Sequence, residues 1–221
     1  MGHLPIILCS LDNQQGTLDE QRIRKNCQTY YNAMKAAFGK AALPLYASKA
    51  LSIKQMYALM QQEDMGVDVV SPGELYTAVQ AGYPMENAYF HGSSKTDADI
   101  RFAMEHKVGF FICDNADELD AIDAEAARQG IRQKVLLRLT PGIDPHTHEK
   151  ISTGRIDCKF GAVIENGQAE ALVLQALSKV NIQLSGYHCH IGSQIFDHVP
   201  FCEAAVLMLR FMAHIRQAHG F

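Results

Sequence analysis

Short apolar segments alternate with longer amphipathic segments along most of this chain, at a repeat of roughly 20–25 residues. The apolar segments have the length of strands. The amphipathic segments carry signals for the start and end of helices, such as Pro72 in a first turn and Gly82 just after a last turn. This alternation is typical of βαβ units, whose right-handed crossovers build a parallel sheet. The sequence therefore predicts an α/β fold, either a closed barrel or an open doubly wound sheet.

The predicted elements can be given by residue range. Strands are expected at 45–47, 66–70, 87–91, 109–114, 134–140 and 182–190. Helices are expected at 18–38, 52–62, 72–81, 97–106, 116–129, 167–178 and 201–219, the first capped by Thr17 with Glu20 in a capping box and the second capped by Ser52. The segment 141–166 is expected to be a long loop, and its length suggests a function.

A barrel is the preferred architecture, because no GxGxxG turn follows the first predicted strand. The chain holds about six strand–helix units, whereas a complete TIM-type barrel has eight units and about 250 residues. We therefore expect a parallel (β/α) barrel truncated after about six of its eight units. Residues 1–17 form an N-terminal segment of uncertain role, and residues 18–221 form the partial barrel domain.

Composition excludes several classes of protein. The formal net charge is −4 with no basic block, so nothing favours nucleic-acid binding. The apolar run at residues 4–11 is too short to span a bilayer and lacks the flanks of a signal peptide. The six cysteines include no CxxC pair, which is typical of reduced thiols in the cytosol. We predict a cytoplasmic protein without a membrane or nucleic-acid partner.

Polar residues follow the predicted strands, where parallel barrels carry their reacting groups. In chain order they are Lys49, Asp68 with Ser71, His91 with Lys95, Asp114, Arg138, and His190 with Ser193. If the six strands are parallel, these side chains converge on one cavity.

Lys49 is the most informative of these residues. Pro44 interrupts the preceding helical pattern, and Leu45–Ala47 then reads as a short buried strand that ends just before this lysine. A partly desolvated lysine amine in such a place can form an imine with an aldehyde. The alternative is that Lys49 is a solvated residue that opens the next helix.

The other strand-end residues also have structural alternatives. Asp68 and Asp114 could cap the helices that follow them. Arg138 lies in an apolar strand, where its charge requires a buried partner, and this favours a functional role. His188 and His190 share one face of a strand, but no third ligand occurs at a matching spacing, so we expect no metal site.

Five stretches in one order give a resemblance to a known family. They are YASKA at 46–50, VDVVSPGEL at 67–75, HGSSKT at 91–96, TGRIDCKFG at 153–161 and HCHIGSQ at 188–194. Together they resemble the pyridoxal-phosphate-dependent ornithine/diaminopimelate/arginine decarboxylase family, whose barrel is of the alanine-racemase type. Within that family they are most similar to the diaminopimelate decarboxylases. The resemblance runs from about residue 16 to residue 221.

The resemblance implies roles for five residues. Pyridoxal phosphate would be bound as an imine on Lys49, the catalytic lysine. His190 would stack on its ring, and Ser193 would lie near its phosphate. Asp68 and Arg138 match positions that line the cofactor next to the lysine.

The resemblance also implies a reaction, the decarboxylation of meso-2,6-diaminopimelate to L-lysine in lysine biosynthesis. The substrate is a small amino acid whose amine displaces Lys49, and the electrons left by CO2 are held by the cofactor. Lys159 matches a lysine in the same polar network, and the full-length enzyme would be a homodimer. Family members continue with a glycine-rich phosphate loop, an acid that pairs with the pyridine nitrogen, and a β-domain. We therefore expect this chain to be an N-terminal part that is weakly active or inactive alone.

Alternatives remain open at this point. One is a decarboxylase of a related basic amino acid, such as arginine, ornithine or carboxynorspermidine. Another is a non-catalytic barrel that binds pyridoxal phosphate, and a third is an unrelated barrel in which Lys49 reacts with a sugar aldehyde. The sequence departs from the family at Ser48, where an apolar residue is more usual, and at Pro72, Ser93, Ser94 and Cys158. None of these departures removes a cofactor contact.

Overall fold

The computed structural model describes residues 6–11, 14–39, 41–143, 160–192 and 195–221. The chain falls into two compact units, Met1–Ala88 and Tyr89–Phe221. Each unit has buried hydrophobic side chains of its own.

The first unit begins with a hairpin that the sequence did not predict. Strand β1 (Ile6–Leu11) pairs antiparallel with β2 (Gln14–Asp19), and helix α1 (Glu20–Phe38) follows directly. The predicted cap at Thr17 is wrong, because this residue lies within the β1–β2 ladder. Asp19 caps the helix instead, and its carboxylate accepts a hydrogen bond at 3.1 Å from the third backbone N–H beyond it.

The remainder of the first unit alternates as predicted. Its elements are β3 (Leu45–Ala47), a 3-10 turn (Ser48–Ala50), α2 (Lys54–Gln62), β4 (Gly66–Val69), α3 (Pro72–Gln80) and a second 3-10 turn (Met85–Asn87). Strands β3 and β4 are parallel, with Ala47 opposite Asp68. The predicted burial of β3 is wrong, since Leu45 is 37% exposed. Side chains such as Tyr57 and Leu75 form the core behind β4.

The predicted cap at Ser52 is also wrong. Ile53 is the N-cap of α2, and no side chain caps this helix. The Ser52 hydroxyl lies 3.0 Å from the hydroxyl of Tyr57 in α2 instead, so it pairs with a side chain of the helix and not with a backbone N–H at the helix start.

The second unit contains the longer run of parallel strands. Its elements are β5 (Ala88–Phe90, whose first residue ends the first unit), α4 (Asp97–Glu105), β6 (Phe110–Cys113), α5 (Ala116–Gln129), β7 (Gln133–Thr140), β8 (Ala162–Val163), α6 (Gln168–Ser178), β9 (Ile182–His188) and α7 (Val199–His219). Strands β5, β6, β7 and β9 pair in parallel in that order, and the short β8 also pairs with β7 in parallel. Parallel pairing therefore places the carboxyl ends of these strands at one edge, as predicted.

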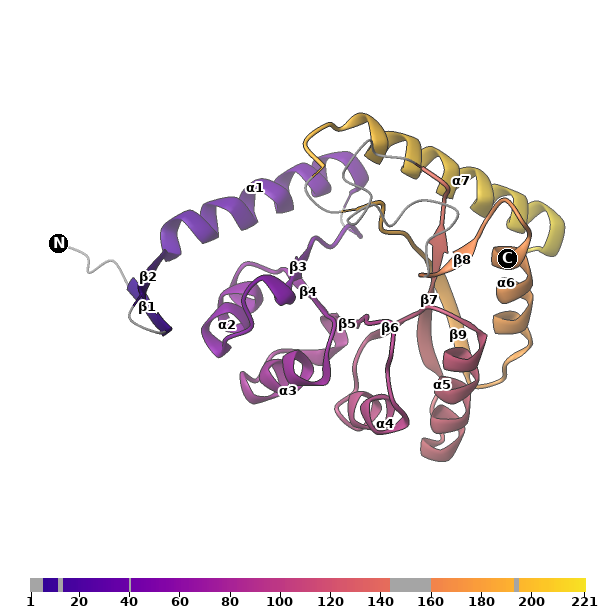
Figure 1. Ribbon diagram of the computed structural model, residues 1–221, viewed down its shortest axis with the longest axis horizontal. Coiled ribbons are helices and arrows are strands. Elements are labelled where there is room, and N and C mark those ends of the chain that lie inside the picture. Colours follow the sequence, from indigo (N-terminus) through magenta and orange to yellow (C-terminus); the bar gives the residue numbers. More distant parts are fainter. Residues whose placement is uncertain (1–5, 12–13, 40, 144–159, 193–194) are drawn as a thin grey trace. The chain divides into compact units, whose positions relative to one another are not determined.

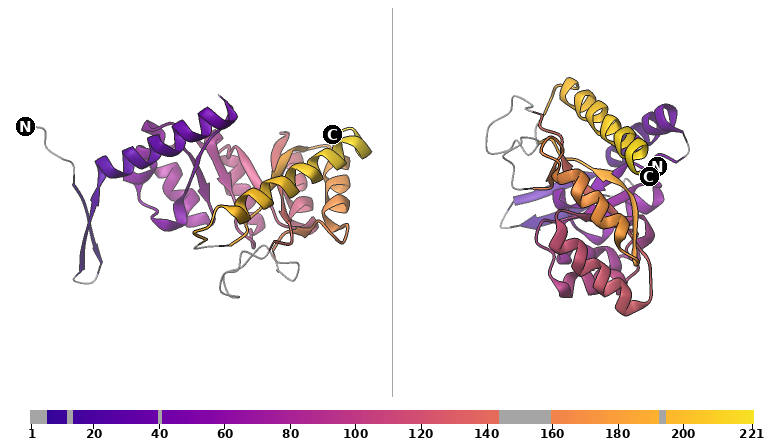
Figure 2. Two further views of the ribbon diagram at one scale, coloured as in Figure 1. Left: turned by 90° about the horizontal axis from the view of Figure 1, so that it is seen from above. Right: turned by 90° about the vertical axis from the view of Figure 1, so that its right-hand side faces the viewer.

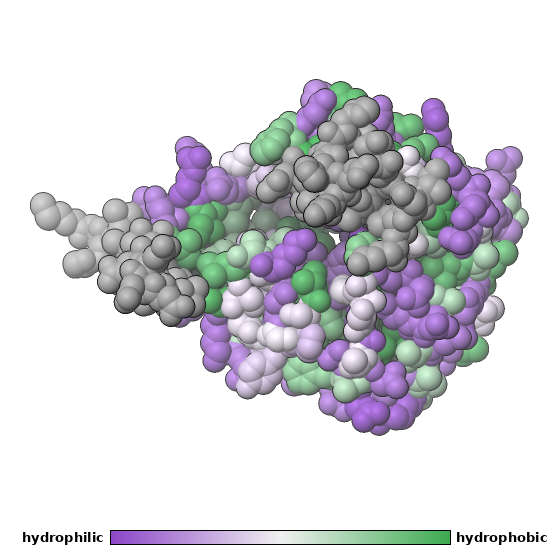
Figure 3. All heavy atoms as spheres, in the orientation of Figure 1, coloured by the Kyte–Doolittle hydropathy of each residue, from purple (hydrophilic) through white to green (hydrophobic). Residues whose placement is uncertain are grey.

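Helices α4 and α5 lie side by side below strands β6 and β7 in Figure 1. Most of their buried residues are apolar, and charged residues lie on their exposed faces. Arg128 of α5 lies 2.5 Å from Glu125 and 3.9 Å from Glu105 of α4. Hydrophilic residues cover much of the surface over α4 and α5 in Figure 3, which is the distribution that amphipathic helices give.

Helix α7 passes beside α6 near the end of the chain, as both views of Figure 2 show. His219 Nε2 lies 2.7 Å from Glu170 Oε1 in the first turn of α6. The inner face of α7 packs on β9 through Phe211, whose ring meets the ring of Tyr187 edge-on at 5.3 Å between centroids. No helix in the described ranges is long and apolar enough to cross a membrane.

Candidate functional site

Lys49 lies in the 3-10 turn that directly follows β3, where the sequence predicted it. Its side chain is exposed in the described structure. The partial desolvation that we expected is therefore not found here. The amine is accessible to an aldehyde as the chain stands, and a lower polarity around it would have to come from groups that bind there.

A buried serine anchors the turn that carries this lysine. Ser48 has no exposed surface, and its hydroxyl donates to Glu74 Oε2 at 2.5 Å. Glu74 stands in the first turn of α3 and also accepts the backbone N–H of Val70 at 3.1 Å and the hydroxyl of Ser71 at 3.0 Å. The carboxylate thus joins the turn after β3 to the start of the next helix.

Asp68 is half-buried at the end of β4, paired in register with the last residue of β3. It does not cap α3, because the N-cap is Ser71, whose hydroxyl accepts the N–H of Glu74 at 3.3 Å. The capping alternative for Asp68 is therefore wrong. Within the first unit, Lys49 directly follows β3, and Asp68 lies near the carboxyl end of the neighbouring parallel strand β4.

Arg138 has the buried partner that the sequence required. The residue is 6% exposed, its Nη1 lies 3.4 Å from Asp114 Oδ1, and the same nitrogen lies 3.2 Å from His91 Nε2. The guanidinium also stacks over the ring of Phe160 at 4.8 Å. Asp114 does not cap α5, because Asn115 does. Arg138 of β7 therefore forms one polar cluster with His91 and Asp114, which follow β5 and β6; Arg138 and Asp114 are buried, and His91 is half-buried.

A glycine makes room for the backbone at this arginine. Gly161 has a φ of 73°, and a Cβ there would lie 2.8 Å from the carbonyl oxygen of Arg138. Thr140 reinforces the approach, because its hydroxyl donates to the carbonyl of Phe160 at 2.6 Å. The end of the TGRIDCKFG stretch is thereby fixed along β7.

His188 ends β9 and meets His91, with ring centroids 4.6 Å apart and an edge-on geometry. Burial, and then the nearby His91 and Arg138, lower the pKa of His188 well below its usual range, so its ring is neutral at neutral pH. The strand ends at this residue, so the half-buried His190 lies outside β9 and the predicted shared strand face of His188 and His190 is wrong. Among the described residues, no cluster of three or more His, Cys, Asp or Glu side chains could hold a metal ion.

Lys95 and Glu118 form a buried ion pair that the sequence did not predict. Lys95 Nζ lies 2.6 Å from Glu118 Oε1, and the two side chains are 1% and 6% exposed. Lys95 was singled out by its place after a strand, but Glu118 was not. The signal for Glu118 was its position three residues after the N-cap Asn115, which is the place of the acid in a capping box.

Some predicted residues cannot be placed. Ser193 and Lys159 lie outside the described residues. Of the others, Lys49 and Asp68 belong to the first unit, and Arg138 and His190 belong to the second.

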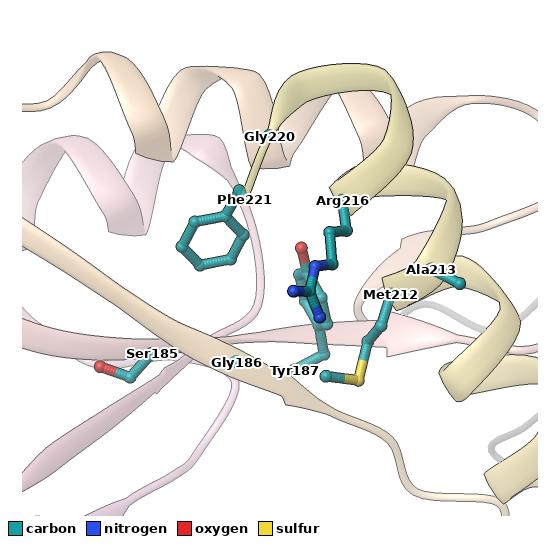
Figure 4. A pocket seen from close by; sticks show the side chains of 8 residues that line it. All are labelled: Ser185, Gly186, Tyr187, Met212, Ala213, Arg216, Gly220 and Phe221. Carbon is teal, nitrogen blue, oxygen red and sulfur yellow. The ribbon is translucent and has the colours of Figure 1, made fainter.

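A pocket of about 640 Å³ lies between β9 and α7 (Figure 4). Its lining residues are Ser185, Gly186, Tyr187, Met212, Ala213, Arg216, Gly220 and Phe221. The Arg216 side chain extends into this space from α7, as the close-up view shows. The lining includes none of the strand-end residues that the sequence singled out, so the pocket is separate from the candidate site.

A comparison with protein families decides the assignment. Residues 20–221 match the family described as "Pyridoxal-dependent decarboxylase, pyridoxal binding domain". The chain belongs to the pyridoxal-dependent decarboxylase family. The match covers nearly the whole chain, and pyridoxal phosphate is the cofactor of this domain, as the resemblance implied.

Curated pyridoxal-dependent decarboxylases of known sequence are similar to the chain. It is 42% identical to the diaminopimelate decarboxylase of Bacillus subtilis over an alignment of 203 residues. The alignment covers 92% of this chain and 46% of the relative. It is 41% identical over 227 residues to that of Halalkalibacterium halodurans, which covers 100% of this chain and 52% of the relative. The chain thus spans about half the length of the curated relatives it matches.

Solved structures of the family agree on the fold. Diaminopimelate decarboxylase from M. jannaschi superposes with a TM-score of 0.80 at 33% identity, covering 90% of this chain and 46% of that one. Diaminopimelate decarboxylase from Helicobacter pylori in complex with L-lysine superposes with a TM-score of 0.78 at 31% identity. The superposition covers 87% of this chain and 48% of that one. The parallel α/β fold of the barrel decarboxylases is therefore confirmed.

The described residues are of the kind that suits this cofactor. An accessible amine on Lys49 can react with the aldehyde of pyridoxal phosphate. Within the described part of the chain, the contacts of Arg138 with Asp114 and His91 both use Nη1, and the guanidinium carries further N–H groups that suit an anionic ligand. The chemistry of these donors fits an aldehyde that carries a phenolate and a phosphate.

Proposed function

We propose that this chain is the cofactor-binding part of a diaminopimelate decarboxylase, which converts meso-2,6-diaminopimelate to L-lysine. One observation carries the proposal. The chain is 41–44% identical to curated diaminopimelate decarboxylases over at least 85% of its length. The decarboxylase of lysine and ornithine from Vibrio vulnificus is 24% identical, a level at which the likeness supports the fold alone. The substrate choice therefore rests on the closer relatives.

In this proposal Lys49 is the catalytic residue, because its amine would hold the cofactor and would be exchanged for the amine of the substrate. Asp68, Arg138, His190 and Ser193 contact the same cofactor. When bound, pyridoxal phosphate supplies the electron sink for the pair of electrons that departing CO2 leaves behind. The exposed amine of Lys49 and the buried guanidinium of Arg138 support these roles.

Arg138 has a distinct part in the proposed chemistry. Its planar guanidinium can present paired N–H donors to an anionic group. Asp114 and His91 hold that guanidinium in one direction. A group held in place needs no reorganisation when the substrate arrives, and this favours binding in a productive orientation.

We also propose that the active protein is a homodimer in the cytoplasm, with residues 18–221 as one domain and residues 1–17 as an N-terminal segment. The four cysteines whose side chains are described are all free thiols, which suits a reducing compartment. Sedimentation of the cofactor-loaded full-length enzyme tests the dimer, and a monomer at micromolar concentration would refute it.

The substrate is tested by competition for the cofactor. The 221-residue chain is loaded with pyridoxal phosphate, and meso-diaminopimelate, L-ornithine or L-arginine is titrated in while the cofactor absorbance is followed. Diaminopimelate should displace Lys49 at the lowest concentration, and any amine product should be lysine. Displacement at lower concentration by ornithine or arginine would refute the substrate. No response to any of them would favour a non-catalytic carrier of the cofactor.

A further inference from the structure

The ammonium group of Lys95 is fully used inside the second unit. It donates to the carbonyl of Gly92 at 2.7 Å, to the carbonyl of Ile112 at 2.9 Å and to Glu118 Oε1 at 2.6 Å. Lysine has three N–H donors, and each of the three has an acceptor. The side chain is 1% exposed and also lies over the ring of Phe90, at 5.5 Å from its centroid. Lys95 therefore has a structural role, because its amine is held by three acceptors and is not available to react.

Glu118 connects Lys95 to the residue that follows β6. Its second oxygen, Oε2, accepts the backbone N–H of Asp114 at 3.5 Å, and its own N–H donates to Asn115 at 2.9 Å. Burial raises the pKa of the Glu118 carboxyl, whereas Lys95 opposes that rise. The carboxylate is therefore costly to keep in place unless the ammonium accompanies it.

The two groups that hold Arg138 are attached to this pair. His91 is the residue before Gly92, whose carbonyl takes one Lys95 proton. Asp114 donates its backbone N–H to Glu118 Oε2. Both His91 and Asp114 contact Nη1 of Arg138, as described above. A change at Lys95 should therefore affect both partners of the Arg138 guanidinium: His91 through Gly92, and Asp114 through Glu118.

We propose that Lys95 and Glu118 are positioning residues that fix the direction of the Arg138 guanidinium for its anionic ligand. This inference rests on the proposed function in one respect only, namely that the ligand of Arg138 is the cofactor. The orientation of the guanidinium by the ion pair is a property of the second unit and can be measured without any ligand.

The test uses two variants and a matched control. Lys95→Met/Glu118→Leu replaces the buried pair by apolar side chains of similar size, an exchange that often leaves stability unchanged. Glu118→Gln leaves only one acceptor oxygen for the two donors, Lys95 and the N–H of Asp114. Lys179→Met is the control, because it breaks a 2.7 Å ion pair with Asp120 on the surface of the same unit.

The first measurement is the exchange of the Arg138 guanidinium protons with water, followed by NMR in the 221-residue chain and assigned with Arg138→Met. Exchange should accelerate at least about tenfold in the double variant, and by less in Glu118→Gln. The dissociation constant for pyridoxal phosphate should rise about tenfold in the double variant. A thermal melt should stay close to that of the unchanged protein, so that a purely structural role is excluded. Lys179→Met should change neither quantity.

Two results would overturn the inference. The first is exchange at Arg138 within twofold of the unchanged protein in a double variant that is folded. The second is faster exchange in the control as well, which would show a general loosening. If the double variant does not fold, the Glu118→Gln variant decides, and unchanged exchange there also overturns the inference. Failure of the unchanged protein to bind pyridoxal phosphate would count against the proposed function, while the exchange rates would still decide the positioning role.

Discussion

Two glutamates occupy the same local place in the two units and have different partners. Glu74 and Glu118 each stand three residues after the N-cap of the helix that follows a strand. Each accepts the backbone N–H of the residue before that cap, at Val70 and at Asp114. Beyond this shared geometry, Glu74 receives the hydroxyl of a serine and Glu118 receives the ammonium of a lysine.

A glutamate three residues after an N-cap therefore has a different role in each unit, according to the donor it binds. In the first unit the neutral donor, Ser48, is the neighbour of Lys49, so Glu74 holds the turn that presents the lysine. In the second unit the charged donor, Lys95, brings a buried ion pair close to Arg138. We therefore expect Glu74 to contribute ordinary hydrogen-bond energy and Glu118 to depend on charge balance.

The largest effect is expected when one partner of the ion pair is removed. Lys95→Met should destabilise the fold by about 3–5 kcal/mol, because Glu118 is left buried without a counter-charge. Denaturant unfolding measures this, with Lys179→Met as the exposed control, for which the loss should stay below about 1 kcal/mol. If Lys95→Met lowers the free energy of unfolding by less than about 1 kcal/mol, Glu118 does not depend on charge balance more than Glu74 does.

A smaller effect is expected at the neutral donor, Ser48. Ser48→Ala should cost about 2 kcal/mol, since the half-buried Glu74 carboxylate loses one donor while Val70 and Ser71 still donate to it. Ser178→Ala is the control, because this exposed hydroxyl donates only to a helix carbonyl at 2.7 Å. Equal losses in the two alanine variants, measured by urea unfolding, would show that Glu74 does not depend on Ser48.

The pH dependence separates the two glutamates further. The pKa of Glu118 is raised above 4.5 by burial, so the folded state binds more protons than the unfolded state as pH rises from that value. The unchanged protein should therefore lose stability relative to Glu118→Gln across this window, by up to about 1.4 kcal/mol per pH unit. Unfolding curves at several pH values between 4 and 7 measure the difference. If the free energy of unfolding of the unchanged protein minus that of Glu118→Gln stays constant or increases with rising pH, the assignment is contradicted.

The smallest effect should be shared by the two units. Ser71→Ala and Asn115→Ala each remove an N-cap, and each should cost about 1 kcal/mol. The comparison predicts similar losses in chemical unfolding, because the capping geometry is common to both. A cost that differs by more than about twofold between them would mean that the caps are not equivalent.

The sequence was informative wherever the deciding contacts are local. Helix α5 has the predicted bounds, because Asn115 and Gly130 mark both of its ends. The predicted buried partner of Arg138 was found, because a charge in an apolar strand allows few alternatives.

Contacts between distant residues were not foreseen. The β1–β2 hairpin pairs an apolar run with a polar one, so neither its period nor its composition predicted it. Lys95 and Glu118 are 23 residues apart, and Ser48 and Glu74 are 26 apart, so no local pattern joins them. Ser48 could be identified only as a departure from the family, and its buried bond to Glu74 gives that departure a physical reason.

The central claim is that Lys49 is the residue that holds pyridoxal phosphate. The most direct measurement is to load the 221-residue chain with the cofactor, reduce it with borohydride and map the labelled peptide, with Lys49→Arg as the control. The account predicts one labelled peptide, which contains Lys49 and is lost in the control. Label on a different lysine alone, or no label on a folded chain, would contradict it.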